Sequence, residues 1–209
     1  MLNTEQILEV FKVLFENIKT PETELNFTNH YTLLVAVILS AQAKDSMVNI
    51  ATVELFKLAD SPQKMLNLGE EELIKYIKII GLYKNKAKNI ISMSQQLLDK
   101  HNGIVPDNFE HLIELAGVGR KTANVILNVA FKQDTMPVDT HVYRLSRRIG
   151  LSNGKDVLKV EQDLLAKIPN PYRHTSHHLL ILHGRYTCKA KGYDCNSCII
   201  NHVCEKNYL

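Results

Sequence analysis

All four cysteines of this chain lie in one short segment near its C-terminus, where together they could ligate a single metal centre. Cys188, Cys195, Cys198 and Cys204 follow the spacing C-x6-C-x2-C-x5-C, and no cysteine precedes Cys188. Four thiolates typically bind a zinc ion or a [4Fe–4S] cluster. Structural zinc usually has two close cysteine pairs, and here only Cys195 and Cys198 are close, so the spacing favours the larger cluster. Zinc and disulfides remain alternatives at this point.

A glycine-rich turn forms a second chemical feature. Gly117 and Gly119 flank Val118 between two predicted helices, and Arg120 and Lys121 follow directly. Glycines permit positive φ and let a phosphate approach the backbone, and the free amides of the next helix favour an anion. The plain alternative is a tight turn in which the glycines only cap helices. The two basic residues favour the interpretation as a phosphate clamp for nucleic acid.

Lys121 and Asp139 are candidates for catalysis. Lys121 stands at a predicted helix N-terminus, where the helix dipole and partial burial would lower its pKa below about 10.4 and leave a nucleophilic amine. Such an amine forms a Schiff base with a sugar carbon, although most lysines simply lie on the surface. Asp139 precedes another predicted helix as its N-cap, and a rigid carboxylate there could also stabilise a cationic sugar.

Composition places these residues in an ordinary globular chain. Its 209 residues are 45% hydrophobic and 22% charged, enough for one large or two small domains. The longest apolar run, 33–39, is too short to cross a bilayer, and the N-terminus does not read as a signal peptide. With thiol-ligated metal, this favours the cytoplasm and no membrane partner. A formal charge of +3 permits a polyanionic partner without requiring one.

The elements that must position these residues are all predicted to be helices. Hydrophobic periodicity and capping residues, such as Asn3 with Gln6 and Ser61 before Pro62, mark their boundaries. We find no strand-like alternation, so the predicted fold class is all-α. The predicted helices are one that ends before Pro21, a buried one around 33–39, one capped by Asp45 that runs to about residue 58, and others at 62–68, 70–80, 85–101, 107–115, 121–131, 140–149, 156–168 and 171–186.

The chain resembles the endonuclease III family, bacterial bifunctional DNA glycosylases of the helix-hairpin-helix superfamily. The resemblance runs from end to end through Leu-Ser-Ala-Gln-Ala at 39–43, Ile-Gly-Leu-Tyr at 80–83, Gly-Val-Gly-Arg-Lys-Thr-Ala-Asn at 117–124, Val-Asp-Thr-His at 138–141 and Leu-His-Gly-Arg-Tyr-Thr-Cys at 182–188. The cysteine spacing is similar to the family's cluster pattern, which implies one [4Fe–4S] cluster. The family's catalytic lysine and aspartate fall on Lys121 and Asp139.

The resemblance also implies an architecture and a partner. Residues 23–133 would form a six-helix domain with the helix-hairpin-helix at about 108–131, and residues 1–22 plus 134–209 a cluster domain, with the active-site cleft between them. The expected substrate is double-stranded DNA with damaged bases or abasic sites, bound by a monomer that flips the target nucleotide out of the stack. Gln42 and Leu82 match the residues that fill the vacated space, although alone they would read as a loop glutamine and a packing leucine.

Other residues concern the surroundings of these sites. The loop between Cys188 and Cys195 would present Lys189 and Lys191 to DNA phosphates, or else serve as a solvated connector. Four histidines on one predicted helix invite a metal interpretation, but no nearby carboxylate or thiol completes a site, so packing is favoured. They are His174, His177, His178 and His183. Ala116 stands where the family typically has proline, and Lys44 replaces a small polar residue; both could change DNA affinity.

The sequence therefore predicts a base-excision repair enzyme. It would remove oxidised pyrimidines and cut the strand 3′ to the abasic site by β-elimination through a Lys121 Schiff base. One alternative is a monofunctional mismatch glycosylase, but such enzymes lack lysine at the hairpin position. The other is a catalytically silent iron–sulfur DNA-binding protein, which would have no need of Lys121 or Asp139.

Overall fold

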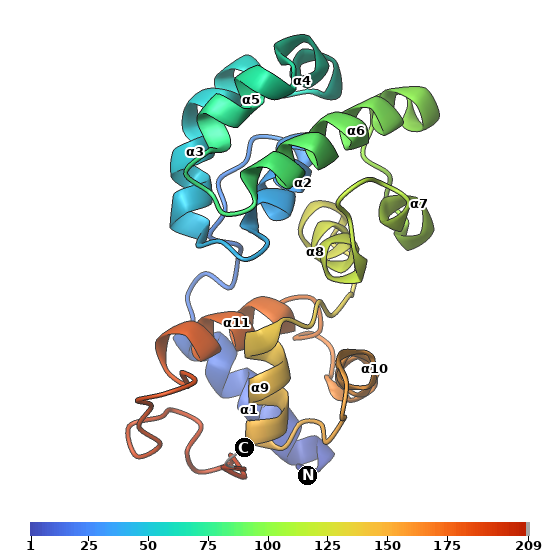
Figure 1. Ribbon diagram of the computed structural model, residues 1–209. Coiled ribbons are helices and arrows are strands. Elements are labelled where there is room, and N and C mark those ends of the chain that lie inside the picture. The colour runs from blue at the N-terminus through green and yellow to red at the C-terminus, as the bar shows by residue number, and fades with distance from the viewer. Residues whose placement is uncertain (208–209) are drawn as a thin grey trace. The chain divides into compact units, whose positions relative to one another are not determined.

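The computed structural model describes residues 1–207, which form eleven α-helices and no strand (Figure 1). The prediction of an all-α fold is confirmed. None of the helices in this described part combines the length and apolar character needed to span a membrane. The helices are α1 (Thr4–Asn17), α2 (His30–Ser40), α3 (Asp45–Leu58), α4 (Pro62–Leu68), α5 (Glu70–Ile77), α6 (Tyr83–His101), α7 (Phe109–Ile113), α8 (Arg120–Phe131), α9 (Thr140–Ile149), α10 (Val157–Lys167) and α11 (Ser176–Tyr186).

The chain divides into two compact units, each with its own hydrophobic core. One unit is Glu24–Phe131 and contains α2 to α8; the other joins Met1–Thr23 to the chain from Lys132 onward and contains α1 and α9 to α11. In the first unit, α2 is buried along nearly its whole length and packs against α3, α6 and α8. In the second, α11 packs against both α1 and α9. Because each unit buries its own apolar residues, each can hold its site residues independently.

Local capping determines where many helices begin, as the sequence predicts. Asn3 and Gln6 form a reciprocal capping box at α1, and Ser61 accepts from the amide of Lys64 with Pro62 at the first helical position of α4. Asp139 caps α9 by accepting from the amide of Val142 at 2.8 Å. These short-range bonds satisfy amides that have no partner within the helix.

Several predicted boundaries are wrong. The helix predicted at 107–115 spans only Phe109–Ile113, and the one predicted at 85–101 begins at Tyr83. Asp45 is the first residue of α3 rather than its cap, and Lys44 in the cap position makes no side-chain bond. The helix predicted at 70–80 ends at Ile77, because the amide of Ile80 turns back to the Ile77 carbonyl in a tighter bond. The helix predicted at 171–186 begins at Ser176 instead, because the preceding residues form turns in which the Tyr172 carbonyl accepts the amides of both Thr175 and Ser176.

Candidate active site and cysteine pocket

The hairpin between α7 and α8 has a backbone that requires glycine at one position. Gly117 has φ +79°, and a Cβ there would lie 2.9 Å from the Cβ of Asn89. Gly119 has open space around its missing side chain, and its carbonyl accepts the Ala123 amide in the first turn of α8. Both glycines are exposed. The hairpin therefore presents bare backbone beside a helix N-terminus, as anion binding requires.

A residue that the sequence analysis did not consider anchors this hairpin. The Gln96 side chain in α6 accepts the Ala116 amide at 2.7 Å and donates to the Glu114 carbonyl at 3.2 Å. One amide side chain thus clamps two backbone groups of the hairpin. Nothing in the sequence around Gln96 signals this contact, because its partners lie about twenty positions away.

Arg120 and Lys121 occupy the first turn of α8, and both are exposed. The Arg120 guanidinium lies over the Phe109 ring, 5.0 Å from its centroid, which restrains the side chain at low entropic cost. Lys121 belongs to the Glu24–Phe131 unit, and Asp139 belongs to the other. Asp139 is partly exposed, and its Oδ1 atom caps α9.

Gln42 and Leu82 share an unusual backbone conformation. Their φ angles are 55° and 60°, in the left-handed region that side chains other than glycine rarely occupy. Both residues are exposed, with Leu82 at 57%. Gln42 follows the C-terminal end of α2, and Leu82 is the residue before α6. An exposed leucine held in this strained conformation contributes little to the core, so packing alone does not explain it.

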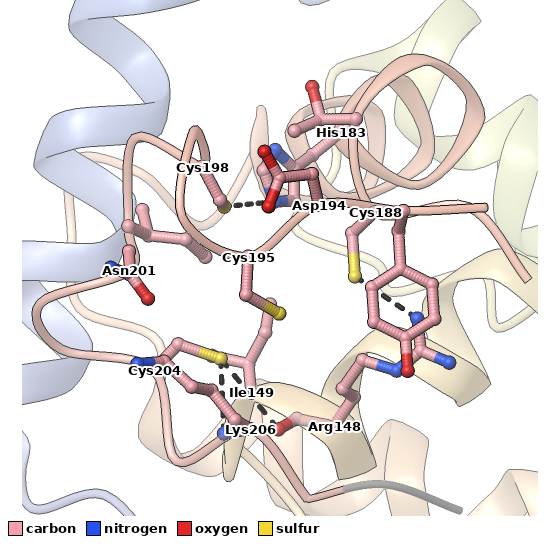
Figure 2. Close-up of a pocket in the computed structure, with 13 residues that line it drawn as sticks. Arg148, Ile149, His183, Cys188, Asp194, Cys195, Cys198, Asn201, Cys204 and Lys206 are labelled. Atoms are coloured by element: carbon pink, nitrogen blue, oxygen red, sulfur yellow. Dashed lines mark hydrogen bonds between the residues drawn. The ribbon is translucent and has the colours of Figure 1, made fainter. Parts of the chain in front are cut away.

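The four cysteines line one pocket in the unit that holds α9 and α11 (Figure 2). The structure holds all four as thiols rather than disulfides. The pocket is also lined by apolar groups such as Ile149 and Ile200. Burial raises the pKa of the Cys198 and Cys204 thiols, so these sulfurs become thiolates readily only beside a compensating cation. The donor set suits a thiolate-ligated metal centre.

Polar groups are directed at three of these sulfurs, as Figure 2 shows. Arg148 Nη1 donates to Cys188 Sγ at 3.3 Å, and the amide of Lys206 donates to Cys204 Sγ at the same distance. His183 Nε2 lies 3.6 Å from Cys198 Sγ. Burial lowers the pKa of His183 to about 4, so its imidazole is neutral near pH 7 and can serve as an N–H donor. Donors of this kind stabilise ligated thiolates.

Arg148 binds the loop between Cys188 and Cys195 at two points. Its Nη1 atom donates to the Lys189 carbonyl at 2.9 Å, and its guanidinium lies 4.0 Å from the Tyr193 ring centroid. Lys189 and Lys191 are exposed on this loop. Two basic side chains are therefore presented on a restrained backbone. No local sequence pattern indicates these contacts of Arg148, because its partners lie about forty positions away.

Three of the four histidines, His177, His178 and His183, lie on α11, whereas His174 precedes the helix, contrary to the prediction. His177 and His178 are buried with their rings in edge contact, and His183 faces a cysteine sulfur. Within residues 1–207, no three His, Cys, Asp or Glu side chains are grouped so as to hold a single metal ion. The favoured expectation of packing fits this arrangement. His183 could have been linked to the cysteines by its position on the predicted helix 171–186, five residues before Cys188.

The fold and the hairpin place the chain in a class of DNA repair proteins. Residues 35–170 match the family model described as HhH-GPD superfamily base excision DNA repair protein. This match covers the hairpin, Lys121 and Asp139.

Full-length relatives narrow the class. The endonuclease III of Haemophilus influenzae is 52% identical over 204 residues, which are 98% of this chain and 97% of that protein. The endonuclease III of Escherichia coli is 50% identical with the same coverage. A solved structure of a trapped endonuclease III–DNA covalent intermediate superposes with a TM-score of 0.92 at 42% identity, covering 99% of this chain and 97% of that one. The chain therefore belongs to the endonuclease III family within the HhH-GPD superfamily.

Proposed function

We propose that this protein is a base-excision DNA glycosylase and abasic-site lyase that acts on oxidised pyrimidines in double-stranded DNA. The observation that carries the proposal is the hairpin, a strained glycine turn followed by exposed Arg120 and Lys121, in a chain about half identical to endonucleases III along its length. The solved relative is trapped as a covalent intermediate with DNA, which requires a nucleophile on that protein.

The hairpin and the basic loop hold the DNA backbone. The exposed backbone at Gly117 and Gly119 and the N-terminus of α8 bind a phosphate, and Lys189 and Lys191 bind others. The damaged nucleotide leaves the stack, because its C1′ atom is unreachable inside the duplex. Leu82 enters the vacated space as an apolar wedge, and the Gln42 amide meets the orphaned base. Their exposed, left-handed backbones support this assignment.

The chemistry uses one amine and one carboxylate. Neutral Lys121 Nζ attacks C1′ while the glycosidic bond breaks and its electron pair leaves with the base, which takes up a proton. The Asp139 carboxylate stabilises the positive charge that develops on the sugar. The amine loses a proton and the sugar ring opens to a Schiff base. Loss of a C2′ proton then expels the 3′ phosphate by β-elimination, and water hydrolyses the imine. Lys121 lies in the Glu24–Phe131 unit, and Asp139 lies in the other unit.

The cysteine pocket fits a [4Fe–4S] cluster held by Cys188, Cys195, Cys198 and Cys204. Support comes from the four thiols around one pocket and from the N–H donors of Arg148 and Lys206 directed at the sulfurs. The bound cluster would supply a covalent cross-link between four points of the C-terminal segment. We propose that the enzyme works as a monomer in the bacterial cytoplasm, where its DNA substrate lies.

The proposal is tested with duplexes that each contain one oxidised base, incubated with and without borohydride. The wild-type protein should cut oxidised-pyrimidine duplexes and form a covalent complex. Lys121→Gln should keep DNA affinity but lose excision and trapping, because the same nitrogen displaces the base and carries the intermediate. A borohydride-stable adduct with Lys121→Gln would show that another amine is the nucleophile. Excision without any trapping by the wild type would favour a monofunctional glycosylase.

A further inference from the structure

Lys86 in α6 is a buried lysine that the proposed mechanism does not use. Its side chain is 5% exposed, whereas Lys84 and Lys88 on the same helix are exposed. Burying an ammonium group is unfavourable unless hydrogen bonds replace its hydration. Burial lowers the pKa of Lys86, which shows this cost. A buried lysine therefore needs specific hydrogen-bond acceptors for its ammonium group.

The partners of Lys86 lie at the C-terminal end of α2. Its Nζ atom donates to the Leu39 carbonyl at 2.8 Å and to the Ala41 carbonyl at 2.6 Å. Carbonyls at a helix C-terminus have no partner within the helix and carry the negative end of its dipole, so an ammonium group suits them. Ala41 is the C-cap residue, and the next residue is Gln42. The side chain of Lys86 therefore holds the backbone that carries Gln42.

The backbone of Lys86 holds the second loop. Its amide donates to the Leu82 carbonyl at 3.1 Å, the bond that begins α6. Leu82 occupies the N-cap position but makes no side-chain capping bond, so its carbonyl bonds to the helix through the Lys86 amide. Gln42 and Leu82 both have left-handed backbones, which persist only where surrounding contacts hold them. One residue thus bonds to Leu82 itself and to Ala41, the residue directly before Gln42.

We infer that Lys86 is a positioning residue that ties the Gln42 loop to the Leu82 loop and sets the separation of the amide and the wedge. Both elements lie within the same compact unit, so the link is short and direct. The inference rests on the proposed function for the roles of Gln42 and Leu82. A wedge and an amide that moved independently would lose part of their effect, because base flipping needs both at once.

Hydrogen exchange of the free protein tests the link without relying on catalysis. Lys86→Met keeps the length of the side chain and removes its donors. Exchange should rise about tenfold in residues 40–43, since charged hydrogen bonds of this kind stabilise by that factor or more, and it should rise less in residues 79–83, where the backbone bond from Lys86 to Leu82 remains. Exchange in the core of α8 should stay unchanged. Lys88→Met is the matched control, because it removes an exposed charge from the same helix and should leave both loops as they are. Unchanged exchange in both loops would overturn the inference.

Excision kinetics test the consequence. Lys86→Met should lower the ratio of duplex to single-strand excision about tenfold, because only a stacked duplex requires the wedge. In a Gln42→Ala, Leu82→Ala background the same substitution should cause no further loss in this ratio. Additional loss there, or equal loss on both substrates, would mean that Lys86 only supports the fold.

The experiment separates this inference from the proposed function. Lys86→Gln keeps a neutral N–H donor group and should show an intermediate excision ratio and intermediate exchange. If Lys86→Met does not fold, exchange of Lys86→Gln decides the question. A wild-type protein that excises no oxidised base would overturn the proposed function, while the exchange data would still decide whether Lys86 links the loops.

Discussion

The Asp139 carboxylate, for which we propose a catalytic role, uses one of its oxygens as a helix cap. Its Oδ1 atom accepts the Val142 amide at 2.8 Å, which fixes the direction of the group at the start of α9. A capping carboxylate is rigid and accepts a charge-assisted hydrogen bond. The same residue can therefore support the helix and stabilise a cationic sugar.

The substitution Asp139→Asn should separate the capping role of this side chain from its proposed catalytic role. Asp139→Asn keeps a capping oxygen, so unfolding measured by circular dichroism should change little. Base excision should fall by about two to three orders of magnitude, since the charge that stabilises the transition state is lost. Cleavage of a preformed abasic site should survive, because its aldehyde needs no departing base. Equal losses on both substrates would contradict the assigned role of Asp139.

Among the elements, α6 supplies an acceptor for the backbone of the hairpin. The resemblance to the family leads us to expect proline at position 116, and the amide of Ala116 is bound by Gln96 at 2.7 Å. Proline restricts φ and has no amide to satisfy, whereas alanine needs an acceptor. The Gln96 side chain supplies that acceptor and also holds the Glu114 carbonyl.

Substitutions at positions 96 and 116 should show whether the Gln96 acceptor is needed only while residue 116 has an amide. Gln96→Leu should lower the free energy of unfolding by about 1 kcal/mol and weaken DNA binding, because the Ala116 amide loses its partner. Adding Ala116→Pro should recover much of both losses, since the unsatisfied amide is gone. Fluorescence anisotropy and thermal unfolding measure the two effects. If Ala116→Pro is equally effective with and without Gln96, the two residues are not coupled.

The hydrogen bonds to Asp163 in α10 should make the stability of the fold depend on pH. Asp163 in α10 accepts from Lys159 and from Ser152 Oγ, which in turn accepts the Gly154 amide. The hydrogen bonds from Lys159 and Ser152 hold the pKa of Asp163 below its usual range. A lowered carboxyl pKa stabilises the fold above the unfolded pKa of about 3.9.

The stability advantage of the wild type over Asp163→Asn should therefore disappear in acid. It should be full near pH 6 and decline as pH falls below the unfolded pKa and through the lower folded pKa. Urea unfolding of both proteins from pH 6 to pH 3 measures the difference. An advantage that is constant over this range would show that the charge of Asp163 contributes nothing.

At the scale of the molecule, the C-terminal segment is attached to the second unit at several points. The amide of Glu205 donates to the Ile149 carbonyl at 3.1 Å, and its carboxylate pairs with the N-terminal ammonium group. The Leu2 amide donates to the neighbouring Gly150 carbonyl at 2.9 Å. Both ends of the described chain thus meet at the end of α9, beside the cysteine pocket.

The purified protein should be yellow-brown and contain iron and sulfide, because thiolate-to-iron charge transfer absorbs visible light. Removal of the metal, or Cys198→Ser, should loosen the loop of Lys189 and Lys191 and weaken DNA binding. The hairpin should keep its structure, because the unit of α2 to α8 has a separate core. Iron analysis, anisotropy and hydrogen exchange check these outcomes. A colourless protein with stoichiometric zinc would contradict the cluster assignment.

Residue type and spacing were enough to predict the features whose partners are close in the chain. Helix caps at Asn3, Ser61 and Asp139 bond to amides three residues on, and the strained turn at Gly117 needs a residue without a side chain, so residue type and spacing suffice. The all-α fold class and the grouping of the four cysteines were predictable for the same reason.

The partners of Lys86, Gln96 and Arg148 could be identified only from the folded structure. Each binds groups between about twenty and forty-seven positions away, on elements that meet only when the core packs. The early end of α5 and the late start of α11 also depend on packed turns rather than on helix propensity. Hydrogen-bond geometry is local, but which distant group completes the bond is set by burial of apolar faces, and that is a property of the whole fold.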